Sequence, residues 1–424
     1  MNLFIQAATL LAPSSALHLC SVDVHILDGV IRQIAAQLSP PDSAHRIDAT
    51  GKYLSAGFMD LCAFSGEPGF EHREDLHSLA AAAAAGGFTA IAVMPNTQPV
   101  TQSKADITYI LNKTAAELVS FMPIGAITKD CDGKVLTEIY DMQRAGAVAF
   151  SDGHAPLQNG GMLLRALQYV LPFGGLVINM PHDDTLIGGR GQMHEGVQST
   201  LLGMRGAPAI AEELMVQRDL YLLQYTHSRL HLHGISTAGS VALVRQAKQN
   251  GLRVTTSISA INLAFDDTVL NDFDSAYKVF PHLREATDIA ALRDGLRDGT
   301  IDGIASNHTP LEDDCKKLEY QYANFGAIGL ETTFAVANEY SGLTANELSE
   351  RLAYAPRRIL GIPEPDFVVN AVADFVLFDT DTEYVLRESG IYSKSKNTPF
   401  LDKKLKGKVW ATGAKGKTWL NKDF

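Results

Sequence analysis

Eight short apolar runs, each of strand length and each followed by a longer stretch of helix-forming composition, dominate the middle of the chain. In order they are YLSAGFMDLCAF, TAIAVMPN, VSFMPIGAI, AVAFSD, GLVINMP, LHLHGIS, RVTTSIS and IDGIASNH. Segments between them, such as EDLHSLAAAAAAGG and VALVRQAKQNG, end in glycine, which commonly terminates helices. Eight strand-then-helix units in succession favour an α/β fold with a (β/α)8 TIM-type barrel.

The two ends of the chain have a different pattern, rich in β-forming residues and turns. Near the N-terminus, VDVHILDGVIRQI contains Asp28 and Gly29, a pair that suits a hairpin turn. Near the C-terminus, ADFVLFDTDTEYVL and LKGKVWATGAKGKTWL are also β-like. We therefore predict that residues 1–55 and 365–424 form a small composite β-sandwich beside a barrel of residues 56–364.

Composition and charge narrow the possible partners. A net charge of −12 argues against a broad basic surface for nucleic acid or anionic membranes. The first residues lack a positively charged leader, and no stretch approaches the ~20 apolar residues that cross a bilayer. The four cysteines are widely spaced, which is typical of reduced thiols. We expect a cytoplasmic protein with neither a nucleic-acid nor a membrane partner.

In such a barrel the functional side chains lie at the C-terminal ends of the strands. The residues expected at those ends are Cys62, Phe64, Asn96, Ile127, Asp152, Met180, His231, His233, Ser259, Asn307 and His308. This set is short of the side chains that bind catalytic metal ions.

An ordered series of motifs resembles the dihydroorotase family of the amidohydrolase superfamily. SAGFMDLCAFSGEPGFEHRED resembles the signature PGFIDxHxHxREPGFEHKED, and MPNT at 94–97 matches the next motif. HLHGISTAGSV, FPHLREATDIAAL and IDGIASNHTP resemble HxxHxSTxxSV, NPPLRxxxDxxAL and IDxIATDHAP, and FGAIGLET, APRRILGI, ADFVLFD and KNTPF continue the series. The resemblance spans essentially the whole chain and implies an amidohydrolase-type barrel.

The resemblance also implies that the first family metal has lost its ligands. The paired histidines at the end of the first strand correspond to Cys62 and Phe64, and a phenyl ring offers no lone pair. The family arginine that pairs with the substrate carboxylate corresponds to Gly66, so a bidentate donor is missing.

Three further family positions carry a different chemistry in this chain. INMPHDDTL resembles INHPEDxSL, which puts Met180 in place of a histidine that binds the second metal, and a thioether is a poor zinc ligand. Asn307 replaces the aspartate that binds metal and shuttles protons, and an amide cannot do the latter at neutral pH. Phe280 replaces a substrate-facing asparagine.

A minority of the family positions is retained. His231 matches the first histidine of the sixth-strand motif, whereas the second corresponds to Gly234, with His233 one position early. Asp152 matches the first aspartate of FSDDG, and the second is Gly153. His308 and Asn96 also match. We therefore predict a degenerate zinc site without a binuclear metal centre.

Two functional hypotheses follow from the resemblance. The first is a non-catalytic protein of pyrimidine biosynthesis, most like the inactive dihydroorotase-like proteins that act as scaffolds for aspartate carbamoyltransferase. No cofactor is expected in that case, and the family implies a homodimer. The bulky side chains of Phe64, Met180 and Phe280 would fill the pocket and argue against a third hypothesis, small-ligand binding without turnover.

The second hypothesis is an active cyclic amidohydrolase with an altered mononuclear zinc site. Cys62 could bind zinc as a thiolate, with His154 or His182 joining His231 or His233. The substrate would be dihydroorotate or another ring amide such as a hydantoin or allantoin. Gly66 argues against dihydroorotate, because Asn96 alone would remain for its carboxylate.

Overall fold

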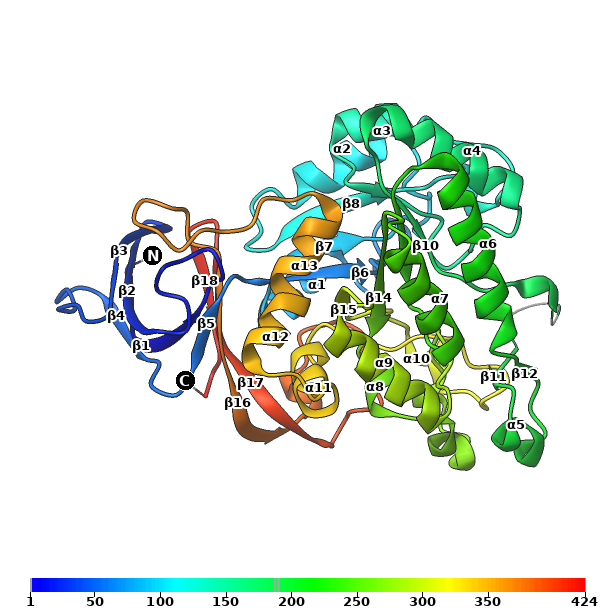
Figure 1. The fold of residues 1–424 in the computed structure, drawn as a ribbon. Helices are drawn as coiled ribbons and strands as arrows, with labels where there is room; N and C mark the ends of the chain where they lie inside the picture. Colours follow the sequence, from blue (N-terminus) through cyan, green and yellow to red (C-terminus); the bar gives the residue numbers. More distant parts are fainter. Residues whose placement is uncertain (1, 187, 189–190, 424) are drawn as a thin grey trace.

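The computed structural model describes residues 2–186, 188 and 191–423, and its centre is a barrel of eight parallel strands in sequence order (Figure 1). An isolated bridge between Ala63 and His308 joins the last unit to the first, so the barrel is nearly closed. The predicted (β/α)8 barrel is confirmed. Its strands are β6 (Phe58–Ala63), β7 (Phe88–Val93), β8 (Ser120–Gly125), β9 (Ala149–Phe150), β10 (Val177–Asn179), β13 (Leu230–His233), β14 (Val254–Ser259) and β15 (Gly303–Ala305).

Helices cover the outside of the barrel, and capping residues in the sequence explain where several of them begin. Asp75 accepts a hydrogen bond from the backbone of Ser78 (2.7 Å) at the start of α1, and that helix ends at Gly86. The helices are α1 (Leu76–Ala85), α2 (Lys104–Lys113), α3 (Ile139–Ala145), α4 (Gly160–Val170), α5 (Val197–Leu202), α6 (Ile210–Thr226), α7 (Ala238–Gln249), α8 (Ile261–Ala264), α9 (Ala286–Asp298), α10 (Asp313–Lys316), α11 (Thr333–Tyr340), α12 (Ala345–Ser349) and α13 (Ala355–Leu360). A two-stranded ribbon of β11 (Met193–His194) and β12 (Gly206–Ala207) precedes α6.

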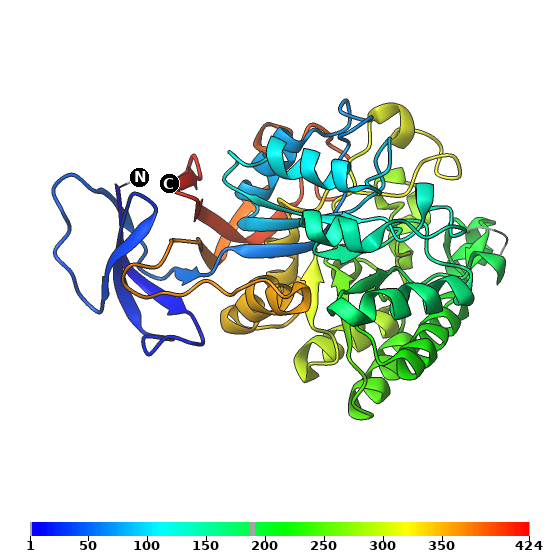
Figure 2. The same cartoon turned by 90° about the horizontal axis from the view of Figure 1, so that it is seen from above.

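Strands from both ends of the chain form one sheet beside the barrel (Figure 2). Its order is β18-β17-β16-β5-β1-β2-β3, with β4 paired to β1, so β5 joins the N-terminal strands to the C-terminal ones. Asp28 and Gly29 both have positive φ (54° and 76°) in the predicted hairpin turn. The strands are β1 (Asn2–Leu11), β2 (Ser21–Leu27), β3 (Val30–Ala35), β4 (His45–Asp48), β5 (Tyr53–Ser55), β16 (Phe375–Val385), β17 (Lys404–Ala414) and β18 (Lys417–Leu420).

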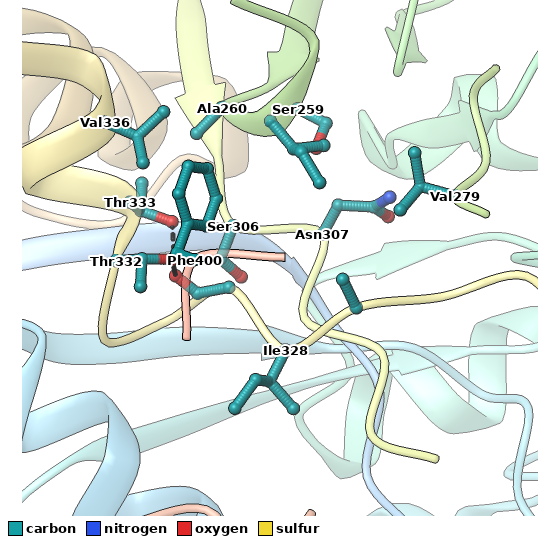
Figure 3. A pocket seen from close by; sticks show the side chains of 13 residues that line it. Ser259, Ala260, Val279, Ser306, Asn307, Ile328, Thr332, Thr333, Val336 and Phe400 are labelled. Carbon is teal, nitrogen blue, oxygen red and sulfur yellow. Dashed lines mark hydrogen bonds between the residues drawn. The ribbon is translucent and has the colours of Figure 1, made fainter. Parts of the chain in front are cut away.

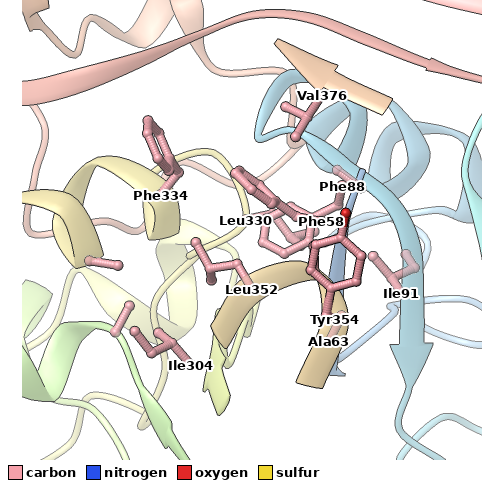
Figure 4. Close-up of a cluster of buried hydrophobic side chains, with 14 of the residues drawn as sticks. Phe58, Ala63, Phe88, Ile91, Ile304, Leu330, Phe334, Leu352, Tyr354 and Val376 are labelled. Carbon is pink, nitrogen blue, oxygen red and sulfur yellow. The ribbon is translucent and has the colours of Figure 1, made fainter. Parts of the chain in front are cut away.

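An aromatic cluster fixes this sheet to the barrel (Figure 4). The ring of Phe58 on β6 lies 5.8 Å from that of Phe88 and 5.5 Å from that of Phe334, centroid to centroid. Phe378 on β16 lies 4.7 Å from Phe334 and 5.6 Å from Phe58. These contacts bury large apolar surfaces from both parts of the chain, which stabilises their association.

A second apolar cluster fills the barrel. It extends from Met59 and Leu61 through Ala92 and Ile178 up to Met180, all of them 1% exposed or less. Apolar packing therefore continues to the C-terminal ends of the strands, where the functional residues of such a barrel would lie. Within the described part of the chain, no helix combines the length and the apolar character that crossing a membrane requires.

Candidate functional site

The two histidines of β13 point into the barrel and bind hydroxyl groups of β14. His231 pairs its Nδ1 with Thr255 Oγ1 (2.9 Å) and its Nε2 with Ser257 Oγ (2.8 Å). His233 Nδ1 lies 2.8 Å from the same Ser257 Oγ. Both side chains are fully buried, and burial lowers the pKa of His231 well below its usual range and that of His233 to about 4. Both are therefore neutral near pH 7 and join β13 to β14.

Cys62 and Asn307 face each other across the gap between the first and last strands. Cys62 Sγ lies 3.6 Å from Asn307 Oδ1, and Asn307 Nδ2 donates to the carbonyl of Phe280 (2.7 Å). Burial, with a further contribution from the nearby Asp60 carboxyl, raises the pKa of the Cys62 thiol well above its ordinary value. Because the thiolate is the form that binds metal, this environment opposes a zinc ligand at Cys62.

Asp152 follows β9 in the sequence, but its carboxylate is hydrogen-bonded to the loop after β8. Oδ1 accepts from the backbone of Ile127 (2.8 Å) and Thr128 (2.9 Å), and Oδ2 accepts from the Thr128 hydroxyl. Burial raises the pKa of Asp152 to about 6, although these hydrogen bonds act in the opposite direction. The neighbouring Asn96 donates to the Asp152 carbonyl (3.0 Å) and accepts from the backbone of His154 (3.2 Å). Asp152 and Asn96 thus hold the loops at the barrel mouth together.

Two glycines at family positions have close neighbours with which a side chain would collide, backbone atoms at Gly66 and the Asn96 side chain at Gly153. A Cβ atom on Gly66 would lie 2.2 Å from the carbonyl oxygen of Phe70 and 2.4 Å from that of Glu74. A Cβ atom on Gly153, which has a φ of 56°, would lie 1.8 Å from Asn96 Oδ1. The resemblance implies an arginine and an aspartate at these two positions, and either side chain would collide with the neighbouring atoms as they stand.

Aromatic rings occupy much of the space at the strand ends. Phe64 stacks on His154 with their centroids 3.7 Å apart and their planes 7° from parallel. Phe280 contacts His182 and His282 edge to face, at 5.2 and 5.6 Å. The two histidines that we considered as replacement ligands, His154 and His182, are thus packed against phenylalanines, and within the described residues no three possible ligands, these histidines included, are grouped to hold a metal ion.

The described residues at this end of the barrel line a small cavity and a larger one. The one beside Asn307 and Ser259 has a volume of about 20 Å³, enough for roughly one water molecule (Figure 3). The other, of about 260 Å³, lies between Phe64 and Phe325 and is also lined by residues that include Gly66, Asn96 and His154. The larger cavity, which Phe64 itself lines, runs against the expectation that Phe64, Met180 and Phe280 fill the pocket.

Among the described residues that line the larger cavity, the only lysine or arginine is Arg73. Its Nη2 donates to Glu312 Oε1 (2.9 Å), and its guanidinium lies 4.5 Å from the ring centre of Phe70. Apolar rings and Pro310 and Leu311 form much of the remaining wall. A substrate carboxylate would have to compete with Glu312 for this guanidinium.

The donor set does not fit the zinc ions that the family resemblance implies. Within residues 2–186, 188 and 191–423, no three His, Cys, Asp or Glu side chains are grouped so that they could hold a metal ion. Zinc sites usually have three or more protein ligands. Phe64 and Met180 cannot contribute in this environment, and the nitrogens of His231 already have hydroxyl partners.

Sequence reasoning missed a buried pair between His308 and Glu74. His308 Nε2 lies 3.4 Å from Glu74 Oε2, and both side chains are fully buried. Burial raises the pKa of Glu74, but the hydrogen bonds and charge of His308, with the hydroxyls of Ser393 and Ser78, lower it overall. The partners are 234 residues apart, so no spacing rule could connect them.

Comparisons with known proteins identify relatives along the whole chain. A family model described as dihydro-orotase-like matches residues 51–240. A dihydroorotase of Pelotomaculum thermopropionicum is 42% identical over 416 residues, 97% of each chain, and one of Geotalea daltonii is 38% identical over the full length of both. An L-hydantoinase structure from Arthrobacter aurescens covers 99% of this chain and 96% of its own, with a TM-score of 0.86 and 23% identity.

Proposed function

The chain belongs to the dihydroorotase-like family, and on that premise we propose that it is a non-catalytic member that serves pyrimidine biosynthesis as a scaffold for aspartate carbamoyltransferase. One observation carries the proposal. At the strand ends, where the resemblance implies metal ligands and an acid/base group, Phe64, Met180 and Asn307 are buried, and the retained Asp152 and His231 are hydrogen-bonded to neighbouring backbone and hydroxyl groups.

The chemistry of ring-amide hydrolysis needs groups that these residues do not supply. It requires an activated water and a side chain that takes up and returns a proton. Asn307 cannot transfer a proton, and Asp152 already accepts three hydrogen bonds from Ile127 and Thr128. The Arg73 guanidinium near the larger cavity is paired with Glu312, so the carboxylate of dihydroorotate would lack a free partner.

The scaffold role is supported by what the fold retains. The chain has the barrel, its helices and the terminal sheet, and the similarity to the dihydroorotase of Pelotomaculum thermopropionicum covers 97% of it. A barrel fold whose strand ends lack a group of metal ligands suits a protein that works through its outer surface. The named partner comes from the resemblance to inactive dihydroorotase-like scaffolds, and we place the complex in the cytoplasm with this chain as a homodimer.

The first test is catalysis by the purified protein with added zinc. Dihydroorotate hydrolysis and the reverse cyclisation of carbamoyl aspartate are measured beside a His231→Ala, His233→Ala double variant. A His72→Ala, His77→Ala variant, altered at two exposed residues, serves as the matched control. We expect the same background rate in all three. Turnover that disappears only in the β13 variant would establish the alternative, a cyclic amidohydrolase with an altered metal site.

The second test is assembly with aspartate carbamoyltransferase from the same organism. The two chains are co-expressed with a tag on one of them, and the complex is measured by light scattering after size exclusion. We expect co-elution at a fixed ratio and a carbamoyltransferase whose assembly depends on this chain. Separate elution of the two proteins, together with unchanged carbamoyltransferase activity, would rule out the scaffold.

A further inference from the structure

A further cavity, of about 520 Å³, lies where helix α11 packs against the terminal sheet, and we call it the sheet cavity. Figure 1 shows α11 beside β16 and β17, and these three elements line the cavity together with β18 and the loop after β16. Its described lining residues are all different from those of the two cavities at the barrel mouth. Sites for small molecules and cofactors generally have volumes of about 300–1,000 Å³, so the sheet cavity is large enough for one. Its lining includes Glu331, Phe334, Tyr384, Tyr392, Lys408 and Trp419.

Aromatic side chains form much of the inner wall of the sheet cavity. Phe334 of α11 is 3% exposed, and Tyr384 of β16 and Trp419 of β18 are partly buried. The ring of Tyr392 lies 6.1 Å from that of Trp419, centroid to centroid, at an angle of 78°. Such walls suit a flat ring, which gains contact area by stacking on one aromatic side chain or meeting another edge to face.

One carboxylate lies among these rings. Glu331 Oε1 accepts from the backbone of Tyr392 (2.5 Å), and Oε2 accepts from that of Ser393 (3.4 Å). Burial raises the pKa of Glu331 to about 7, although these hydrogen bonds and the charge of Lys396 act in the opposite direction. Each carboxylate oxygen has two lone pairs, so both can accept a further hydrogen bond. A flat ring that carries an N–H or amino group would therefore find an acceptor in Glu331.

Basic side chains lie at the mouth of the sheet cavity. Arg387 and Lys422 are both exposed there. Arg387 Nη1 pairs with Asp402 Oδ1 (2.6 Å), and Lys408, further in, pairs with Asp423 Oδ2 (2.6 Å). Lys422 has no acidic partner within residues 2–186, 188 and 191–423. An anionic group at the mouth would therefore meet one ammonium group that no carboxylate neutralises.

Aromatic walls with a carboxylate can also hold a cation, but two lysines of this chain already lie over the rings. Lys408 Nζ is 5.9 Å from the ring centre of Tyr384, and Lys422 Nζ is 5.8 Å from that of Tyr392. Both are within the reach of cation–π attraction. A cationic ligand would compete with these ammonium groups and would be repelled by them. The arrangement favours a ligand with a flat ring inside and an anionic group at the mouth.

We propose that the sheet cavity binds a nucleoside 5′-monophosphate, with its base against Trp419 and Tyr392 and its phosphate at Lys422 and Arg387. Bases stack on aromatic side chains largely irrespective of their identity. Phosphate oxygens accept charge-assisted hydrogen bonds from lysine and arginine. Every common base carries an N–H or amino group that can donate to Glu331. The inference does not depend on whether the barrel is catalytic, because the sheet cavity shares no described lining residue with the barrel mouth.

Isothermal titration calorimetry of the purified full chain tests the proposal, with AMP, GMP, CMP and UMP as probes. We expect at least one of them to bind once per chain with a Kd below about 1 mM. Ribose 5-phosphate, which has no base, and the corresponding nucleoside, which has no phosphate, should each bind about tenfold more weakly or worse. Absence of binding for all four nucleotides at millimolar concentration would overturn the proposal.

A charge reversal at the mouth locates the site. Lys422→Glu changes an exposed side chain and should weaken binding of the nucleotide about tenfold or more, with an unchanged circular dichroism spectrum. Lys104→Glu, at an exposed position on α2, makes the same change in net charge and should leave the Kd unchanged. Equal affinity of Lys422→Glu and the wild type would overturn the proposal, because the nucleotide would then occupy another site.

Tryptophan fluorescence tests the stacking. The chain has two tryptophans, Trp410 and Trp419, of which Trp419 lines the sheet cavity. We expect the nucleotide to quench the fluorescence of the wild type with the Kd found by calorimetry. In Trp419→Phe the quenching should disappear, while the phenyl ring preserves binding in the calorimeter. Quenching that persists in Trp419→Phe would show that the base does not stack on Trp419 and would contradict the proposed arrangement.

Discussion

If His233 is a neutral core residue, its replacement should remove part of the acid sensitivity of folding. Burial lowers its pKa in the folded protein from 6.5 to about 4. Between these two pH values His233 is protonated in the unfolded chain and neutral in the folded chain. The contribution of His233 to the free energy of unfolding is therefore fully present above pH 6.5 and is lost as the pH falls toward 4.

The size of the effect follows from the two pKa values. Between pH 7.5 and pH 5 the proton taken up by the unfolded chain lowers the free energy of unfolding by about 2 kcal/mol, because each pKa unit corresponds to about 1.4 kcal/mol. In His233→Gln this contribution is absent. The difference in free energy of unfolding between the two pH values should therefore shrink by about 2 kcal/mol relative to the wild type.

Urea unfolding monitored by circular dichroism measures both proteins at both pH values, with chelator present. His77→Gln is the control because its ring is 83% exposed, and it should keep the wild-type difference. Comparing differences between pH values removes any constant loss of stability that the substitution causes. An unchanged difference in His233→Gln would refute the reasoning that this histidine is buried as the neutral base.

Three further predictions concern the same end of the barrel. Phe64→Ala should lower the free energy of unfolding by about 3 kcal/mol, which is the low end for such truncations because Phe64 already borders a cavity. The exposed control Tyr322→Ala should change it by less than about 0.5 kcal/mol. Equal effects of the two substitutions in urea unfolding would contradict the packing role of Phe64. Gly153→Ala should lower the free energy of unfolding by about 1–3 kcal/mol, and adding Asn96→Ala to the same chain should recover part of that loss. Strictly additive losses of free energy would show that the contact with Asn96 Oδ1 is unimportant. Zinc in excess should leave the Tm unchanged. If zinc did bind, a concentration 100 times its Kd would increase the free energy of unfolding by about 2.7 kcal/mol and so raise the Tm. A rise in Tm that is absent in the His231→Ala, His233→Ala variant would reveal a metal site.

The sequence was sufficient to predict the fold because the relevant signals are local. Apolar runs followed by helix-forming segments recur eight times, and the structure confirms the barrel they predict. The hairpin at Asp28 and Gly29 and the start of α1 after Asp75 follow the same local rules. The pairing of both termini in one sheet was predicted from composition alone and is also confirmed.

The candidate site was less predictable because its contacts join distant segments. Motif matching identified the replaced positions, but it could not show that the backbone at Gly66 approaches Phe70 and Glu74 too closely for any side chain. Nor could it connect Glu74 to His308, or indicate that a cavity of about 260 Å³ remains beside Phe64. These features depend on tertiary packing, which residue identity alone does not determine.

A barrel can lose its site and keep its fold because the two depend on different residues. The strands and helices supply the stability, whereas catalysis uses side chains at the strand ends. Under the proposed function the retained residues have structural roles, since His231 is hydrogen-bonded to hydroxyls of β14 and Asp152 to the loop after β8. Restoring one family residue at a time would therefore not rebuild a metal centre. An arginine at Gly66 would collide with the Phe70 carbonyl, and a histidine at Met180 would still lack partners among Phe64, Cys62 and Asn307. The loops would have to move together, so we expect single reversions to reduce stability without producing zinc binding.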